Sequence, residues 1–120
     1  MRIDVKNNII NNLKIMSQED NQTFAHQVYA IIAAIPSGNV ITYGQIAKMA
    51  GMPTYVRQVC LVLRRLPKES KLPCHRIINS QGYLSVKGDT YQKYKLKLIE
   101  EGIKFNHKDK IDLKIYGWNN

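Results

Sequence analysis

The feature that most constrains the fold is a pair of short predicted helices joined by a tight turn that contains glycine. Thr42 can cap the first of these helices, over residues 43–50, and Gly51 ends it. Pro53 suits the first turn of the second helix, over residues 53–65, because a backbone N–H has no intrahelical partner there. Two short helices in this order are typical of a helix-turn-helix, whose second helix enters a groove of DNA.

The second helix of this pair has one apolar side and a basic outer surface. The residues predicted to face the core are Val56, Val59, Cys60 and Leu63. The other sides carry residues that we expect to contact DNA, namely Arg57, Gln58, Arg64 and Arg65. The pattern by itself leaves open a second interpretation, a small helical domain with a solvated basic face.

The rest of the chain adds two longer helices and a small hairpin. Apolar residues at helical spacing predict a helix over residues 21–35, ended by a Pro-Ser-Gly group. A turn at residues 79–82 between two apolar segments predicts a hairpin, or wing, over residues 77–86. The last clear helix is predicted over residues 89–101, with Gly102 closing it. The predicted fold class is therefore mainly α with a small β wing, a winged helix-turn-helix.

The length of the chain, 120 residues, is that of one domain. Residues 1–20 are rich in Asn, so we predict a flexible amino-terminal arm followed by a single domain over residues 21–120. The longest uncharged apolar run, residues 28–36, is far shorter than the roughly 20 residues that span a bilayer. No secretory signal is recognisable in the arm. We expect no membrane partner and a cytoplasmic, nucleoid-associated location, or a nuclear one in a eukaryote.

Basic residues outnumber acidic ones by 18 to 9, and the net charge is +9. From Lys48 to Arg76 there are seven basic residues and a single acid, Glu69. This excess makes a polyanion the first partner to expect. The two cysteines, Cys60 and Cys74, do not form a Cys-x-x-Cys pair, so we predict free thiols and no metal site.

Cys74 and His75 are the first candidates for chemistry. A cysteine reacts as a thiolate, which needs a base or a positive charge nearby to lower its pKa. His75 can take the proton, while Arg76 and Lys71 supply positive potential, so the sequence predicts an activated thiol. A Cys-His pair on its own is more often a buried thiol beside a surface histidine, and this alternative stays open.

Glu101 gives a second, independent indication of a site. It lies on the same face of the last predicted helix as Tyr94 and Leu98, so its carboxylate ends an apolar stripe and needs a partner. With His75 as that partner, Cys74, His75 and Glu101 would form a relay of nucleophile, base and orienting acid. The alternative is that Glu101, in the last turn, reaches solvent.

Tyr43 and Arg57 are the remaining candidates. A tyrosine at a helix start can bond a phosphate, and an arginine on the outer helix can enter a groove or fill the gap left by an extruded base. Either side chain can equally be an ordinary surface residue.

Four motifs in this order resemble the O6-alkylguanine-DNA alkyltransferase family. They are TYGQIA at residues 42–47, RQV at 57–59, PCHR at 73–76 and EG at 101–102, and the resemblance covers about residues 22–105. It implies a winged helix-turn-helix that enters the minor groove and flips the alkylated guanine out of the duplex. The alkyl group then passes irreversibly to a cysteine thiolate, in a single turnover and without a cofactor.

The resemblance also implies a role for each candidate residue. Cys74 would be the alkyl acceptor, His75 the water-linked base and Glu101 its orienter. Arg57 would replace the flipped base, and Tyr43 would contact the phosphate that rotates. Arg76 would join the DNA contacts, and the lesion pocket would include Pro73, Val86, Lys87 and Gly88.

Departures from the family pattern leave more than one function open. We expect the chain to lack the family's separate amino-terminal domain, and it resembles the alkyltransferase-like branch, whose members bind O6-alkylguanine but have lost the acceptor cysteine. Because Cys74 is retained, the first prediction is a protein that binds O6-alkylguanine in double-stranded DNA as a monomer and transfers the alkyl group. The second is a non-catalytic lesion sensor that recruits nucleotide excision repair proteins. The third is a winged-helix protein with no lesion preference.

Overall fold

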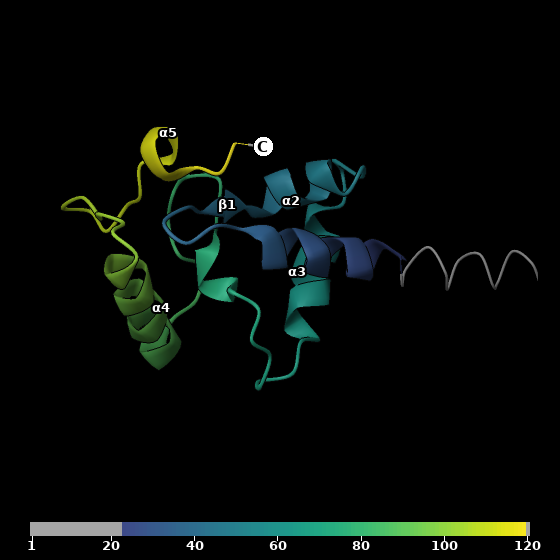
Figure 1. Cartoon of the computed structure of the whole chain (residues 1–120), viewed down its shortest axis with the longest axis horizontal. Coiled ribbons are helices and arrows are strands. Elements are labelled where there is room, and N and C mark those ends of the chain that lie inside the picture. Colours follow the sequence, from purple (N-terminus) through teal and green to yellow (C-terminus); the bar gives the residue numbers. More distant parts are fainter. Residues whose placement is uncertain (1–22, 120) are drawn as a thin grey trace, which may run out of the picture.

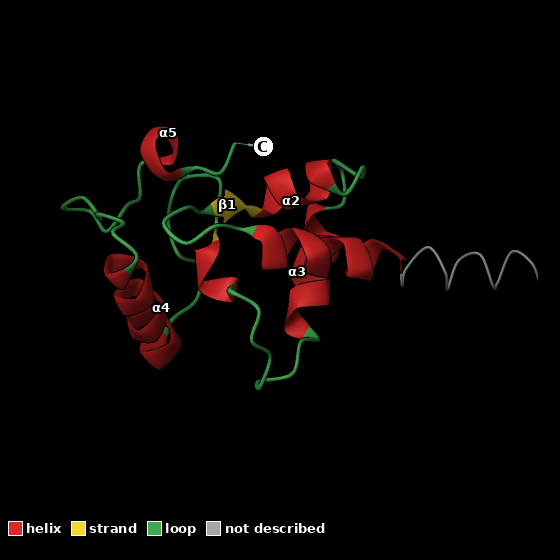
Figure 2. Cartoon of the chain, viewed as in Figure 1, coloured by secondary structure: helices red, strands yellow, loops and turns green. Residues whose placement is uncertain are grey.

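The computed structural model describes residues 23–119, and within them the chain is mainly helical (Figures 1 and 2). The predicted amino-terminal arm lies outside the described residues. The first element is a helix over residues 23–34. The elements that follow are β1 (Ile41–Thr42), α2 (Tyr43–Met49), α3 (Val56–Arg64), the 3-10 turn η1 (Cys74–Arg76), β2 (Ile77–Ile78), α4 (Gly88–Glu100) and α5 (Leu113–Tyr116).

The two strands form a small parallel sheet in which Ile41 pairs with Ile77 and Thr42 with Ile78. The hairpin predicted over residues 77–86 is therefore wrong in its pairing, since residues 83–87 form no strand. The turn itself is present, because Asn79 N–H donates to the carbonyl of Tyr83 at 2.9 Å. β2 is buried on both of its faces, which favours a parallel pair inside the molecule over a hairpin at its surface.

The sheet lies between two apolar cores. The first core joins the helix over residues 23–34 to α2 and α3, and its buried residues include Ile32, Ile46 and Val59. The second core lies in the carboxyl-terminal part of the chain, and its buried residues include Leu98 of α4 and Ile78 of β2. Because neighbouring strand residues belong to different cores, η1, which directly precedes β2, is held where the two halves meet.

The predicted helix pair is confirmed, although the second helix starts later than predicted and each helix ends one residue earlier. Thr42 caps α2, since its hydroxyl accepts a hydrogen bond from Gln45 N–H at 3.1 Å. The second helix begins at Val56, three residues later than predicted. Pro53 lies instead inside a turn closed by the 2.8 Å hydrogen bond from Tyr55 N–H to the carbonyl of Met52. Proline is favoured at that second position of a turn because its φ is already set.

The side chains of α3 differ from the prediction at two positions, Val56 and Cys60, of which Cys60 is only partly buried. Val59 is fully buried, as expected, but Val56 is 40% exposed. α4 spans almost the predicted residues, and Glu101 is its carboxyl-terminal cap. The short helix α5 was not predicted. It is capped by Asp112, whose carboxylate accepts from Lys114 N–H at 2.9 Å.

No helix among residues 23–119 is both long enough and apolar enough to pass through a membrane.

Candidate functional site

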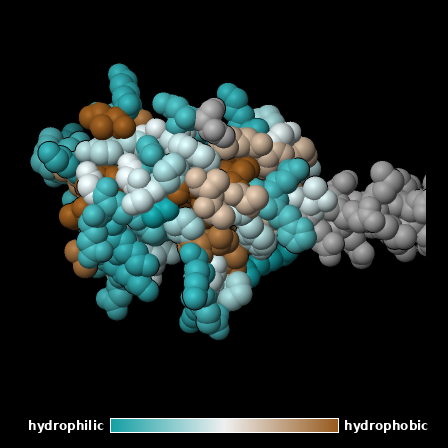
Figure 3. Space-filling model, in the orientation of Figure 1, coloured by the Kyte–Doolittle hydropathy of each residue, from teal (hydrophilic) through white to brown (hydrophobic). Residues whose placement is uncertain are grey.

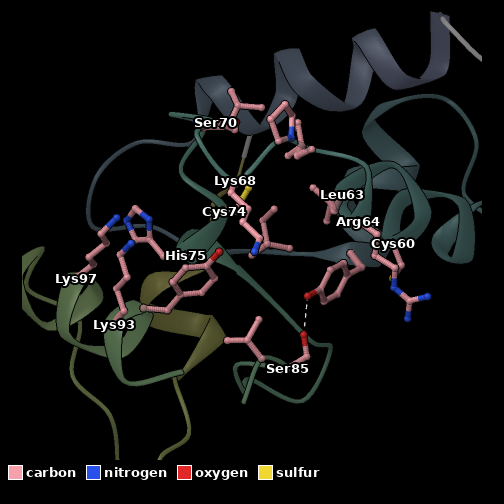
Figure 4. A pocket seen from close by; sticks show the side chains of 17 residues that line it. Cys60, Leu63, Arg64, Lys68, Ser70, Cys74, His75, Ser85, Lys93 and Lys97 are labelled. Carbon is pink, nitrogen blue, oxygen red and sulfur yellow. Dashed lines mark hydrogen bonds between the residues drawn. The ribbon is translucent and has the colours of Figure 1, made fainter. Parts of the chain in front are cut away.

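A cleft of about 640 Å³ lies between α3, the loop that follows it, η1 and α4 (Figure 4). Five of the predicted site residues line it: Tyr43, Arg64, Cys74, His75 and Val86. Figure 3 shows hydrophilic side chains along α4 and along the loop after α3, with less hydrophilic surface between them. A volume in this range is typical of sites for small molecules or single bases.

His75 is held in one orientation at the back of the cleft. The side chain is buried, and its Nε2 lies 2.7 Å from Oε2 of Glu101. Because an ionised carboxylate only accepts hydrogen bonds, Nε2 carries the hydrogen and donates it. In the neutral ring the other nitrogen, Nδ1, is then the acceptor. The predicted contact between His75 and Glu101 is thus present in the structure.

Glu101 is the centre of a larger network. Arg76 donates to its carboxylate from Nε at 2.9 Å and from Nη2 at 2.8 Å. Gly38 N–H donates to Oε1 at 3.1 Å, and the φ of Gly38, +91°, is one that glycine adopts without strain. Burial alone would raise the pKa of the Glu101 carboxyl, but the hydrogen bonds from Arg76, His75 and Gly38 outweigh it and lower the pKa to about 2. Glu101 is therefore ionised at every physiological pH.

Arg76 occupies a different place from the one predicted. Besides its three hydrogen bonds to the Glu101 carboxylate, it donates from Nη1 to the carbonyl of Ile35 at 2.7 Å. Its side chain is only 17% exposed. We therefore correct its assignment as a DNA contact: Arg76 is the internal ion-pair partner of Glu101.

Cys74 is a partly buried thiol, and burial raises its pKa. The sequence predicts the opposite direction, because it places positive charge at Arg76 and Lys71. In the structure Arg76 is bonded to Glu101, and Lys71 is an exposed side chain outside the cleft lining. The expected electrostatic activation of the thiol by these two residues is therefore wrong.

Two tyrosines from different elements line the cleft together with the Cys74 thiol. Tyr43, the first residue of α2, shares a 2.6 Å hydrogen bond with the hydroxyl of Ser85 (Figure 4). Burial raises the pKa of Tyr43, and the bond to Ser85 partly opposes that rise. Tyr94 of α4 lies edge-on to His75, with ring centroids 6.2 Å apart. Burial also raises the pKa of Tyr94, so both phenols are neutral at physiological pH.

The other predicted DNA contacts are spread over α3 and its end. Arg64 lines the cleft, whereas Arg57 and Gln58 are exposed on α3 outside the lining and Arg65 is its carboxyl-terminal cap. Of the predicted lesion-pocket residues, only Val86 lines the cleft. Pro73 is half-buried beside Cys74, and Lys87 and Gly88 are exposed at the start of α4.

Sequence reasoning missed several lining residues. Ser85 directly precedes a predicted pocket residue, and the free thiol of Cys60 was assigned to the core side of α3. The signal for the α4 residues was present, since Tyr94 and Lys97 lie on the helix face that leads to Glu101. Tyr94 was assigned to the core, and the basic residues Lys93 and Lys97 were not assigned to the site.

Among the described residues, no group of three or more His, Cys, Asp or Glu side chains is placed to hold a metal ion.

Comparisons with known proteins agree with this geometry. The family described as "6-O-methylguanine DNA methyltransferase, DNA binding domain" matches residues 23–103. The DNA base-flipping protein of Escherichia coli is 45% identical over 104 residues, which cover 87% of this chain and 79% of that protein. Alkyltransferase-like protein 1 of Schizosaccharomyces pombe is 39% identical over 79% of this chain and 94% of its own length.

Solved structures give the same result. The crystal structure of the Schizosaccharomyces pombe protein, in complex with damaged DNA containing O6-carboxymethylguanine, matches with a TM-score of 0.72 and 37% identity, over 82% of this chain and 97% of that one. Mycobacterium tuberculosis O6-methylguanine methyltransferase matches with a TM-score of 0.57 and 32% identity, over 65% of this chain and 47% of that one. The protein is thus of the class in which a DNA-binding helix pair lies beside a cleft that contains a cysteine. It belongs to the DNA-binding-domain family of the 6-O-methylguanine-DNA methyltransferases.

Proposed function

We propose that this protein binds double-stranded DNA containing O6-alkylguanine and takes the flipped base into the cleft beside Cys74. The observation that carries the proposal is the cleft itself, where Cys74 lies next to a histidine held by Glu101 and beside a helix with an exposed basic surface. The names of its relatives, a DNA base-flipping protein and an alkyltransferase-like protein, support it.

The fold proposed for DNA binding is a winged helix-turn-helix. α2, the turn that contains Gly51 and α3 supply the helix pair, and residues 79–87 would take the position of the wing. We propose that α3 enters the minor groove with Arg57 filling the gap left by the flipped base. Tyr43 would exchange its bond with Ser85 for a phosphate. We propose that the protein binds DNA as a monomer.

In the proposed reaction Cys74 accepts the alkyl group. His75 takes the thiol proton at Nδ1, directly or through water, and the ionised Glu101 stabilises the resulting imidazolium. The thiolate attacks the alkyl carbon, so an S–C bond forms as the C–O6 bond breaks. The electron pair of that bond stays on the purine, and the proton returns to it as guanine N1–H. The products are a thioether and guanine, and each protein molecule reacts once.

A second candidate function is a lesion sensor that does not transfer the alkyl group. The specific observation that favours it is the thiol: burial raises the pKa of Cys74, whereas an efficient acceptor needs a lowered pKa. In this case the bound, flipped lesion would recruit other proteins, of which those of nucleotide excision repair are the first to test.

A binding titration tests the proposal common to both candidates. Fluorescence anisotropy compares two labelled duplexes that differ only in O6-methylguanine against guanine, using the Cys74→Ser variant so that no transfer consumes the ligand. We expect at least tenfold tighter binding of the lesion duplex, roughly one well-paired base contact. Equal affinity for both duplexes would contradict the proposal and leave a DNA-binding protein without lesion preference.

A further inference from the structure

An exposed leucine lies in the middle of the basic face of α3. Leu61 is 42% exposed and belongs to neither of the two apolar cores. It is four residues from Arg57 and three from Arg64, so these three side chains lie on one face of the helix. Val59, the buried residue of α3, points to the opposite side. Leu61 is therefore an apolar side chain that points to solvent between two cations.

The charge of this face fits a polyanion. α3 and its carboxyl-terminal cap, Arg65, contain three arginines and no acid. Cations at the two ends of a helix face can neutralise phosphates at the borders of a groove. The residue between the cations then faces the floor of that groove. On this face of α3 that residue is Leu61.

Helix geometry places Leu61 relative to the flipped base. Four residues of an α-helix span about 6 Å, which is roughly two base-pair steps of B-DNA. When Arg57 fills the gap left by the flipped base, Leu61 lies over base pairs within about two steps of that gap. Apolar side chains such as leucine are frequent in proteins that bind the minor groove.

One group on the floor of the minor groove distinguishes G·C from A·T pairs. Both kinds of pair present hydrogen-bond acceptors there, but only G·C adds a donor, the N2 amino group of guanine. A leucine side chain has no acceptor, so it separates that amino group from water without replacing the lost hydrogen bond, which is unfavourable. Over a floor that lacks the amino group, the same side chain buries its apolar surface without this cost.

On the basis of the proposed function, in which α3 enters the minor groove, we propose that Leu61 makes lesion recognition depend on the neighbouring sequence. Leu61 contacts the floor of the minor groove beside the flipped base. It favours lesions whose neighbouring pairs lack the guanine N2 amino group, and in natural DNA these are A·T pairs.

Two other effects also favour A·T neighbours, and both are independent of Leu61. A narrow A·T-rich minor groove attracts arginine, and a weakly paired neighbourhood lowers the cost of flipping a base. Both effects persist when Leu61 is replaced. The quantity that isolates Leu61 is therefore the change, between parent and variant, in the ratio of two dissociation constants.

The experiment uses the full chain with Cys74→Ser and two duplexes that contain O6-methylguanine. The two pairs on each side of the lesion are G·C in one duplex and inosine·C in the other, since inosine is guanine without the N2 amino group. Fluorescence anisotropy gives the dissociation constants. We expect the inosine duplex to bind about tenfold more tightly, the size expected for one donor left without a partner. Leu61→Ala should lower this ratio to about two, mainly by weakening binding of the inosine duplex, whereas Leu61→Met should keep the ratio.

The matched control is Leu96→Ala, which shortens an exposed leucine of α4 and should keep the parent ratio. A parent ratio near one would overturn the inference while leaving lesion binding intact. An unchanged ratio in Leu61→Ala would also overturn it, because the preference would then come from the arginines or from the DNA. Duplexes with guanine in place of the lesion test the proposed function separately. If they bind as tightly as the lesion duplexes, the proposed function fails, and the inference fails with it.

Discussion

The exchange of Glu101 for Gln tests the network that holds His75. The carboxylate accepts hydrogen bonds from His75, from two nitrogens of Arg76 and from Gly38, and its side chain is 13% exposed. Glutamine keeps the shape of the side chain but removes the negative charge. Arg76 then remains in a mostly enclosed position without its ion-pair partner, which is costly.

The lowered pKa gives the size of the effect. The pKa of Glu101 falls from 4.5 to about 2 on folding. At about 1.4 kcal/mol for each pKa unit, this corresponds to roughly 3 kcal/mol of free energy of unfolding at neutral pH. Because the folded pKa is the lower one, this stabilisation is complete above about pH 5 and decreases as the pH falls towards 2. At pH 3 about 1.5 kcal/mol of it remains.

Urea denaturation at pH 7, 5, 4 and 3 measures this difference. Trp118, the single tryptophan, packs against the first core and reports unfolding by its fluorescence. We expect Glu101→Gln to lower the free energy of unfolding by roughly 2 to 3 kcal/mol at pH 7 and by about half as much at pH 3. Glu100→Gln, at an exposed neighbouring position, is the control and should change little. A loss that is the same at pH 7 and pH 3 would refute the assignment of a lowered pKa to Glu101.

Three further predictions concern turn geometry and DNA binding. Gly82→Ala should cost about 2 to 4 kcal/mol of unfolding free energy, since the new Cβ would lie 2.4 Å from the carbonyl oxygen of Ile111 and φ is +94°. Gly51→Ala, with φ +80° and open space, should cost only about 1 kcal/mol, and equal costs in thermal melts would contradict the steric account. Arg57→Ala should weaken binding of an O6-methylguanine duplex by about tenfold more than binding of a guanine duplex. The control variant Lys108→Ala should weaken binding of both duplexes alike. If Arg57→Ala weakens both equally, Arg57 does not fill the gap left by the flipped base. Finally, the affinity for DNA should fall with a slope of roughly −3 to −5 in a plot of log K against log salt, and a flat plot would contradict the phosphate contacts.

Local patterns were sufficient to predict the parts of the fold that depend on a few neighbouring residues. Thr42 and Gly51 mark the ends of α2 by their own backbone and side-chain preferences. The phase of α4 predicted that Glu101 would be near the buried interior, because its helix face also carries Leu98. The contact between Glu101 and His75 was one of two alternatives, because the sequence left open a solvent-exposed carboxylate, and the structure shows the contact.

Features that depend on distant parts of the chain could not be predicted in this way. The pairing of β2 with β1 joins segments about 36 residues apart, and neither strand alone indicates its partner. Arg76 has the charge of a DNA contact, but Glu101 and the carbonyl of Ile35 bind it inside the molecule. Pro53 was ambiguous even locally, since the same fixed φ suits a helix start and the second position of a turn.

Intact-protein mass spectrometry after incubation with a duplex containing O6-methylguanine tests the role of Cys74 most directly. The account predicts a mass gain of about 14 Da, the exchange of the thiol hydrogen for a methyl group, with no more than one gain for each protein molecule. The gain should be absent with Cys74→Ser and with a guanine duplex. Tight, lesion-selective binding in the same sample without any gain in mass would contradict alkyl transfer and identify the protein as a sensor.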